Sequence, residues 1–169
     1  MSAPHTDSTQ KLILIVDDIE DNRVLLERAL MNAGYATQSA ASGPEALSMI
    51  SRQLPDMVLL DWMMPNLSGL ETLRAIREIH SSARLPVIMC TAVGEEMSVV
   101  AAISAGANDY VTKPLSIPIL RARMAAHFEQ RAVIDTLDTA RDAAEQRLSE
   151  QARAIFDRSP PLARRWDTH

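Results

Sequence analysis

Cysteine is almost absent from this sequence of 169 residues, whose one example is Cys90. A single cysteine cannot form an internal disulfide, and no group of Cys and His has the spacing of a zinc site, so a reducing compartment is favoured. Long apolar runs are missing too: none approaches the ~20 residues that cross a bilayer, and the first ten residues are polar. We therefore expect a cytoplasmic protein with no membrane segment.

Excess positive charge is also lacking, because 17 Lys and Arg stand against 22 Asp and Glu, for a formal net charge of −5. Binding to nucleic acid rests on a surplus of cations, so we expect no direct nucleic-acid partner. The hydrophobic content of 47% and the length suit one domain with a modest appendage. Disorder throughout the chain is excluded.

Short apolar segments alternate with segments of helical periodicity along the first two thirds of the chain. The predicted strands are 11–16, 35–40, 55–60, 86–90 and 108–112, and the predicted helices are 21–33, 42–50 with Ser42 as cap, 69–79 and 95–105. This alternation predicts right-handed crossovers and a parallel sheet covered on both faces. We expect a doubly wound α/β fold with five parallel strands in the flavodoxin-like order 2-1-3-4-5.

From Ile117 the chain is predicted to be helical, as an extended C-terminal helix. Heptads counted from Ile134 place apolar side chains on a seam that two polar residues, Arg141 and Gln151, interrupt. The seam residues are Ile134, Leu137, Ala144, Leu148 and Ile155. A long helix has little to stabilise it in isolation, so we favour a dimeric coiled coil over a lone solvated helix. The expected organisation is a disordered lead (1–10), a domain (11–129), this helical extension (130–158) and a disordered tail (159–169).

Polar side chains follow four of the predicted strands. Asp17 and Asp18 end the first, Asp61 the third, Thr91 the fourth and Lys113 the fifth. In an open parallel sheet, ligands bind at the carboxyl ends of the strands, where the strand order reverses. The three carboxylates should therefore lie together, and they would repel one another without a cation. An all-oxygen ligand set predicts Mg²⁺ or Mn²⁺ rather than zinc.

The remaining groups at this edge suit phosphoryl transfer. A hydroxyl from Thr91 and a compact positive charge from Lys113 can stabilise the charge on a transferring phosphoryl group. A carboxylate is itself a covalent phosphoryl acceptor in aspartyl-phosphate chemistry. The site is therefore predicted to transfer a phosphoryl group to an aspartate.

These motifs resemble the receiver domain of two-component response regulators over residues 11–129. The resemblance rests on motifs in the order and on the elements expected of receivers: Asp17-Asp18, Asp61-Trp-Met-Met-Pro65 followed by Gly69, Thr91-Ala92, and Tyr110 ahead of Lys113-Pro114. It implies that Asp61 accepts a phosphoryl group from a phosphohistidine of a sensor histidine kinase or a phosphotransfer protein. It also implies metal ligation by Asp18, Asp61 and the backbone carbonyl of Met63, with Asp17 acting largely through water.

The resemblance assigns roles to further residues. Lys113 would pair with the phosphoryl group, and Thr91 would swing to hydrogen-bond it while Tyr110 turns inward. The Lys113-Pro114 bond would be the cis peptide of the family. Ala92, Met63 and Val93 would flank the phosphoryl group; Met63 and Val93 are apolar and cannot orient water, which predicts slow self-dephosphorylation. Tyr110 as a simple packing aromatic is the alternative.

The output of such a switch is less well defined. Residues 130–169 contain no helix-turn-helix with a basic recognition helix. We expect a signalling phosphoacceptor rather than an enzyme, which passes its state to a downstream protein partner or a homodimer through the last helix. One alternative is the front end of a larger sensor or cyclase, since 153–160 resembles the lead-in to a PAS domain. Another is a metal-dependent phosphohydrolase with Asp61 as nucleophile.

Overall fold

The computed structural model describes residues 10–92 and 96–158. The chain divides into two compact units, Met1–His127 and Phe128–His169. The predicted disordered lead, apart from Gln10, and the predicted disordered tail lie outside the described residues, as does Val93. Within the described ranges, no helix combines the length and the apolar composition that crossing a membrane requires.

Five strands form one sheet in the first unit. They are β1 Leu12–Val16, β2 Ala36–Ala40, β3 Met57–Asp61, β4 Val87–Ala92 and β5 Asp109–Lys113. Their order is β2-β1-β3-β4-β5, and every neighbouring pair is parallel. The predicted fold class is confirmed. The strand order reverses between β1 and β3, so the carboxyl ends of these two strands border the crevice that binds ligands in such sheets.

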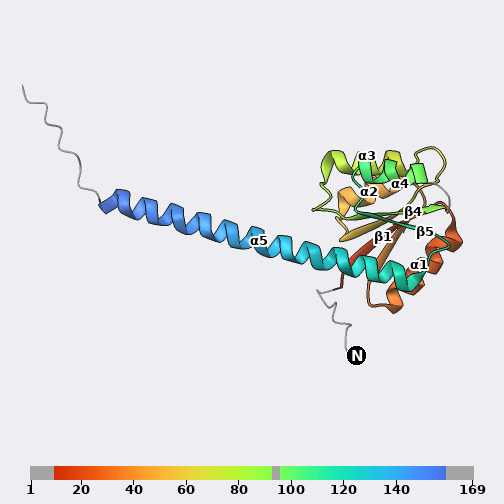
Figure 1. The fold of residues 1–169 in the computed structure, drawn as a ribbon, viewed down its shortest axis with the longest axis horizontal. Coiled ribbons are helices and arrows are strands. Elements are labelled where there is room, and N and C mark those ends of the chain that lie inside the picture. Colours follow the sequence, from red (N-terminus) through yellow and green to blue (C-terminus); the bar gives the residue numbers. More distant parts are fainter. Residues whose placement is uncertain (1–9, 93–95, 159–169) are drawn as a thin grey trace, which may run out of the picture. The chain divides into compact units, whose positions relative to one another are not determined.

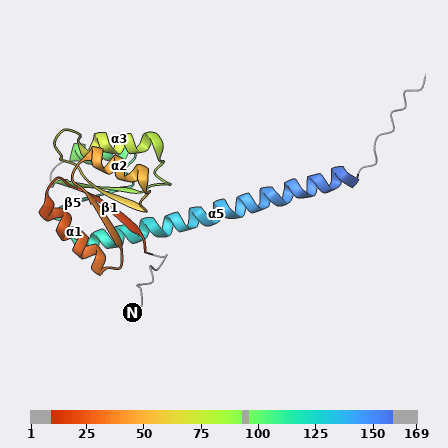
Figure 2. The ribbon, with the colours of Figure 1, turned by 180° about the vertical axis from the view of Figure 1, so that it is seen from behind.

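Helices cover both faces of the sheet (Figures 1 and 2). Those that connect the strands are α1 Glu20–Asn32, α2 Gly43–Arg52, α3 Gly69–Ile79 and α4 Glu96–Ser104, and α5 follows β5. α2, α3 and α4 lie on one face; α1 and the first turns of α5 lie on the other. Ser42 caps α2 as predicted, because its hydroxyl accepts a hydrogen bond from the Glu45 amide. Gly34, which follows α1, has a left-handed φ of 91°, as is common where a helix ends.

The three central strands, β1, β3 and β4, are mainly apolar because both of their faces are covered. All five residues of β3 are buried, and β1 is buried from Ile13 to Val16. Leu73 and Ile76 bring the apolar stripe of α3 onto this sheet and are 0% and 1% exposed. This burial makes the sheet a rigid platform for the residues at its edge.

Arg77, in the last turn of α3, fastens the loops at the opposite edge of the sheet. Its guanidinium donates hydrogen bonds to the backbone carbonyls of Gly106, His80 and Leu85, and to Asn108 Oδ1 at 2.9 Å. Burial lowers the pKa of Arg77, although the group stays charged at any physiological pH. This side chain joins α3 to the loops before β4 and β5.

α5 runs Ile117–Arg158, so one helix contains the end of the first unit and the described part of the second. In the first unit, Leu120 and Met124 are 1% and 0% exposed and pack in the core. From Asp135 to Asp157, every residue is exposed. The predicted long C-terminal helix is confirmed, and most of its length presents its side chains to solvent.

Candidate functional site

The polar residues predicted at the strand ends lie at one edge of the sheet. Asp17 and Asp18 directly follow β1, Asp61 is the last residue of β3, and Lys113 is the last residue of β5. Thr91 lies in β4 between Cys90 and Ala92. In the strand register, Cys90 pairs with Asp61 of β3 and Ala92 pairs with Lys113 of β5. The parallel ladder therefore brings groups from four strands to one place.

Three carboxylates form the centre of the site. One oxygen each of Asp17, Asp18 and Asp61 lies within 4.8 Å of the others. Asp17 and Asp61 are 3% and 4% exposed, so water screens their repulsion poorly. Asp18 Oδ1 is buried and has no hydrogen-bond partner among the described residues. An orphaned carboxylate oxygen in an all-oxygen cluster fits a small divalent cation such as Mg²⁺ or Mn²⁺.

Lys113 supplies positive charge to this cluster. Its Nζ lies 2.8 Å from Asp61 Oδ1 and 3.3 Å from Asp17 Oδ2. Burial lowers the pKa of Lys113, but its hydrogen bond to Asp61 and the charges of Asp61 and Asp17 outweigh burial and raise that pKa. The ammonium group is therefore charged and points at the carboxylate of Asp61.

Asp61 experiences opposing influences. Burial raises its pKa, the hydrogen bond and charge of Lys113 lower it, and the carboxylates of Asp17 and Asp18 raise it again, so the net shift is upward. Each added cation at this edge would favour the ionised form. The ionised carboxylate is the nucleophilic form of the group.

Thr91 and Tyr110 take different places around the cluster. Thr91 is 1% exposed, and its Oγ1 is buried without a hydrogen-bond partner in the described part of the chain. Tyr110 is half-buried on β5 and packs against the main hydrophobic core. The Thr91 hydroxyl is thus a donor that the present arrangement leaves unused.

Two residues that sequence reasoning missed hold Asp17 in position. Asn22 Nδ2 donates to Asp17 Oδ2 at 3.0 Å, and Arg23 Nη1 donates to the Asp17 carbonyl at 2.7 Å. The Ile19 amide adds a hydrogen bond to Asp17 Oδ1 at 2.9 Å. Their position in the first turn of the helix after Asp17-Asp18 was the available signal, because that turn adjoins the strand end.

Gly69 packs against the backbone of Asp61 and Trp62. A Cβ at this position would overlap the carbonyl of Asp61 and the Cα of Trp62, so only glycine fits. The Gly69 amide donates to the Trp62 carbonyl at 3.0 Å, and a capping box between Ser68 and Glu71 starts α3 at this residue. The beginning of α3 thereby sets the position of Asp61.

The remaining predicted residues lie in several environments. Met63 is 66% exposed, two residues beyond Asp61; Ala92 is exposed at the end of β4; and Val93 lies outside the described residues. The Lys113-Pro114 peptide bond is cis. Of the predicted seam, Ile134 is half-buried, whereas Leu137, Ala144, Leu148 and Ile155 are exposed.

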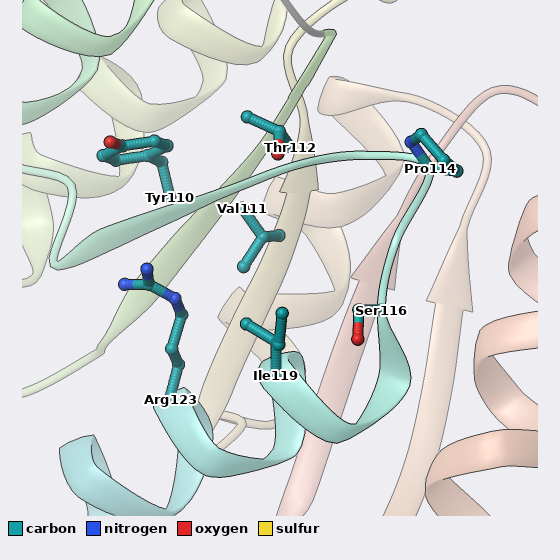
Figure 3. Close-up of a pocket in the computed structure, with 7 residues that line it drawn as sticks. All are labelled: Tyr110, Val111, Thr112, Pro114, Ser116, Ile119 and Arg123. Carbon is teal, nitrogen blue, oxygen red and sulfur yellow. The ribbon is translucent and has the colours of Figure 1, made fainter.

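A separate pocket of about 310 Å³ lies between β5 and the start of α5. Figure 3 shows Val111 directed from β5 toward Ile119 of α5, while Tyr110 and Thr112 lie on the other side of the strand. Arg123 completes this pocket beside Tyr110. β5, which ends at Lys113 of the acidic site, therefore also lines a pocket that it shares with the first turns of α5.

The family model described as response regulator receiver domain matches residues 13–125, more than half of the chain. The chain belongs to the response regulator receiver family. This match includes four strands completely, β1 from its second residue, and every residue of the acidic edge, so the predicted family is confirmed by comparison as well as by fold.

Named response regulators are similar to this chain in sequence. The phosphate regulon transcriptional regulatory protein PhoB of Rhizobium meliloti is 38% identical over 147 residues, which cover 87% of this chain and 64% of PhoB. Response regulator PleD of Caulobacter vibrioides is 38% identical over 125 residues, which cover 74% of this chain and 28% of PleD. The chain thus spans less than two thirds of the length of these relatives.

Solved receiver structures share the fold. A putative response regulator from Chloroflexus aurantiacus matches with a TM-score of 0.66 and 36% identity, covering 70% of this chain and 97% of that one. The receiver domain of NtrX from Brucella abortus matches with a TM-score of 0.65 and 33% identity, covering 69% and 98%. Both cover nearly the whole of the solved chain, so the receiver unit here is a full-length match to them.

Proposed function

We propose that this chain accepts a phosphoryl group on Asp61 from a phosphohistidine of a sensor histidine kinase or a phosphotransfer protein. The observation that carries the proposal is the contact of 2.8 Å between Lys113 Nζ and Asp61, inside a cluster of three carboxylates. A lysine and a metal-binding cluster around one buried carboxylate are the groups that phosphoryl transfer to an aspartate requires. Membership of the receiver family supports the same chemistry.

The reaction is an exchange of one phosphorus bond for another. A carboxylate oxygen of Asp61 attacks phosphorus, an O–P bond forms, and the N–P bond of the phosphohistidine breaks. The imidazole leaves with the bonding electron pair and takes up a proton from solvent. Lys113 neutralises a phosphoryl oxygen as charge develops, and the buried Thr91 hydroxyl gains the acceptor that it lacks.

Asp17, Asp18 and Asp61, with the backbone carbonyl of Met63, would hold the divalent cation. Bound there, a cation supplies charge neutralisation for the carboxylates and for the phosphoryl oxygens. Asn22 and Arg23 keep Asp17 oriented toward the cluster through their hydrogen bonds. This ligand set is favoured by Asp18 Oδ1, a buried oxygen without a hydrogen-bond partner among the described residues.

The acyl phosphate is proposed to act as a switch of protein interactions. A hydrogen bond from Thr91 to the phosphoryl group would draw that side chain toward Asp61, which frees space that Tyr110 can occupy. Such an element has two states, and phosphorylation biases them because Thr91 and Lys113 bind the phosphoryl group in one state better than in the other. The output would pass through the last helix, to a protein partner or a second copy.

Phosphoryl labelling tests the acceptor assignment. We expect the full chain to take up one phosphoryl group from acetyl phosphate with Mg²⁺, and Asp61→Asn to take up none. Asp138→Asn, an exposed aspartate of α5, is the matched control and should label like the wild type. Label that persists in Asp61→Asn, or sustained turnover of a small phosphoester, would contradict the proposal and favour the hydrolase alternative.

The lifetime of the label gives the first testable prediction. Met63 cannot orient a water molecule toward the phosphoryl group, whereas an amide at that position can. We expect Met63→Asn to lose its label about 10-fold faster than the wild type, which is less than the roughly 100-fold or more of a general base because an amide orients water without taking its proton. Met31→Asn, another exposed methionine, is the control. An unchanged decay rate in Met63→Asn would show that Met63 does not control hydrolysis of the phosphoryl group.

A further inference from the structure

The part of α5 that follows the receiver unit carries an 11-residue repeat. Leucine recurs at Leu137 and Leu148, and arginine at Arg147 and Arg158. The other recurrences are Ala132 with Ala143 and Ala154, and Val133 with Ala144 and Ile155. Repeats of 11 residues correspond to about 3.67 residues per turn, close to the straight α-helix, so equivalent positions stay on one line along the helix.

These positions define an apolar stripe that differs from the heptad seam. The stripe residues are Val133, Leu137, Ala140, Ala144, Leu148 and Ile155. Val133 and Ala140 take the places that Ile134 and the polar Arg141 have in the heptad count. The exposed fractions of the side chains favour the stripe over the heptad seam. Val133, Leu137 and Leu148 are 59%, 64% and 65% exposed, whereas Ile134 is half-buried. Val133, Leu137, Leu148 and Ile155 therefore lie along one line that faces solvent, and the exposed Phe156 lies next to its end.

We propose that a second copy of this chain covers the stripe, so that two α5 helices pair in parallel and in register. In that arrangement, Leu137 and Leu148 each meet their own copies, and the intervening layers of Ala140 and Ala144 let the two backbones approach. The 11-residue period predicts a supercoil that is nearly straight and slightly right-handed. The inference deepens the proposed function, and rests on it only where it assigns a surface to the output of the last helix.

The polar residues on and beside the stripe favour the parallel direction. In a parallel pair, Gln151 meets the partner's Gln151, and two amides can hydrogen-bond each other. An antiparallel pair that matched Val133 with the partner's Ile155 would instead set Gln151 against the partner's Leu137, which buries an amide without a partner.

Charge complementarity also fits two copies of one sequence. Glu145 and Arg147 are two residues apart and therefore flank the stripe on opposite sides. A parallel pair places Arg147 beside the partner's Glu145, and the two-fold axis repeats the contact. Arg141, at the margin of the stripe, is met by Glu145 of its own helix at 3.7 Å. Glu145 thus lies between Arg141 of its own helix and Arg147 of the second copy.

Sedimentation equilibrium of the full chain tests the proposal. We expect a dimer, and expect Leu137→Gln combined with Leu148→Gln to raise its Kd at least about 100-fold, because four leucines leave the interface. Met31→Gln combined with Ile79→Gln removes two exposed side chains, 61% and 76% exposed, from the receiver unit and should leave the Kd unchanged. A monomeric wild type, or equal loss of dimer in both double variants, overturns the proposal.

Cysteine cross-linking tests direction and register. Burial raises the pKa of the Cys90 thiol to about 12, so the native cysteine stays unreactive. We expect copies of Leu137→Cys to cross-link to each other, and Val133→Cys to do so faster than Ile134→Cys. Cross-linking of Leu137→Cys only to Gln151→Cys overturns the parallel arrangement, and faster reaction of Ile134→Cys restores the heptad register.

Labelling separates this inference from the proposed function. The Leu137→Gln and Leu148→Gln double variant should accept a phosphoryl group from acetyl phosphate as the wild type does, because neither residue belongs to the acidic site. Loss of the dimer with intact labelling supports both proposals. A wild type that labels but stays monomeric overturns only the pairing of α5, and a dimer that does not label overturns only the acceptor role.

Discussion

The receiver unit and the C-terminal part of α5 use the same residue types in opposite ways. In the receiver unit, leucines such as Leu73 are completely buried, and charged groups such as Asp61 are held in fixed contacts. Along α5 from Asp135, leucines such as Leu137 are mostly exposed, and ion pairs such as that of Arg141 with Glu145 join exposed side chains. The first unit therefore contains its own stabilising core, whereas the second has no buried side chain among its described residues.

Truncating one leucine in each unit is the strongest test of this difference. We expect Leu73→Ala to lower the free energy of unfolding by about 2 to 5 kcal/mol, because it leaves a cavity beneath α3. Leu137→Ala should change it by less than about 0.5 kcal/mol at a concentration where the chain is monomeric. Urea denaturation measures both, and equal effects would contradict the contrast between the two units.

A smaller loss of stability is expected at Gly69, the first residue of α3, which packs against the Asp61 carbonyl. Gly69→Ala forces a Cβ against the Asp61 carbonyl, which should cost about 1 to 3 kcal/mol of stability and slow phosphoryl labelling. Gly34→Ala is the matched control: its φ of 91° makes alanine unfavourable by about 1 kcal/mol, but a Cβ there meets nothing. Labelling should be slowed in the first variant alone.

Asp109 provides a pH-dependent contact at the end of the receiver unit. Its carboxylate binds Arg123 at 2.8 Å and His127 at 3.0 Å. Burial raises the pKa of Asp109, but the hydrogen bonds from His127, the Tyr110 amide and Arg123 outweigh burial and lower it.

A carboxyl whose pKa is lower in the folded state stabilises the fold above its unfolded pKa of about 3.9, and this stabilisation disappears as the pH falls through the folded value. We therefore expect Asp109→Asn to be less stable than the wild type at pH 5 to 6, by less than Leu73→Ala, and the difference to shrink below about pH 4. Thermal unfolding across this range measures it. If the stability difference between Asp109→Asn and the wild type instead grew as the pH fell, the pKa of Asp109 would not be lowered in the folded state.

The smallest effect belongs to the exposed ion pair of α5. Arg141 and Glu145 lie 3.7 Å apart with side chains 67% and 69% exposed. Solvent screens such a pair, so Arg141→Ala should change the stability of the monomeric chain by less than about 0.5 kcal/mol. Circular dichroism during heating measures this, and a larger loss would mean that α5 stabilises itself without a second helix.

Much of the fold could be predicted because buried parallel strands have continuous apolar runs. The run from Leu12 to Val16 and the aspartates behind it predicted both a strand and its functional end. Helix boundaries were predicted to within about two residues where a cap marked them, as at Ser42 and Gly34. The contacts of Arg77 escaped prediction, because they join loops far apart in sequence through a side chain with no local signal.

At the site, the sequence determined which chemical groups stand at the strand ends, because a parallel sheet exposes the residues that follow its strands at a single edge. Only the tertiary structure decided that Lys113 reaches Asp61, that Asn22 and Arg23 orient Asp17, and that Gly69 abuts the Asp61 carbonyl. These contacts depend on the spacing of strands and helices in three dimensions. In α5 the sequence contains both the heptad and the 11-residue spacing, and the structure adds the exposure of Val133 and the partial burial of Ile134, which favour the second.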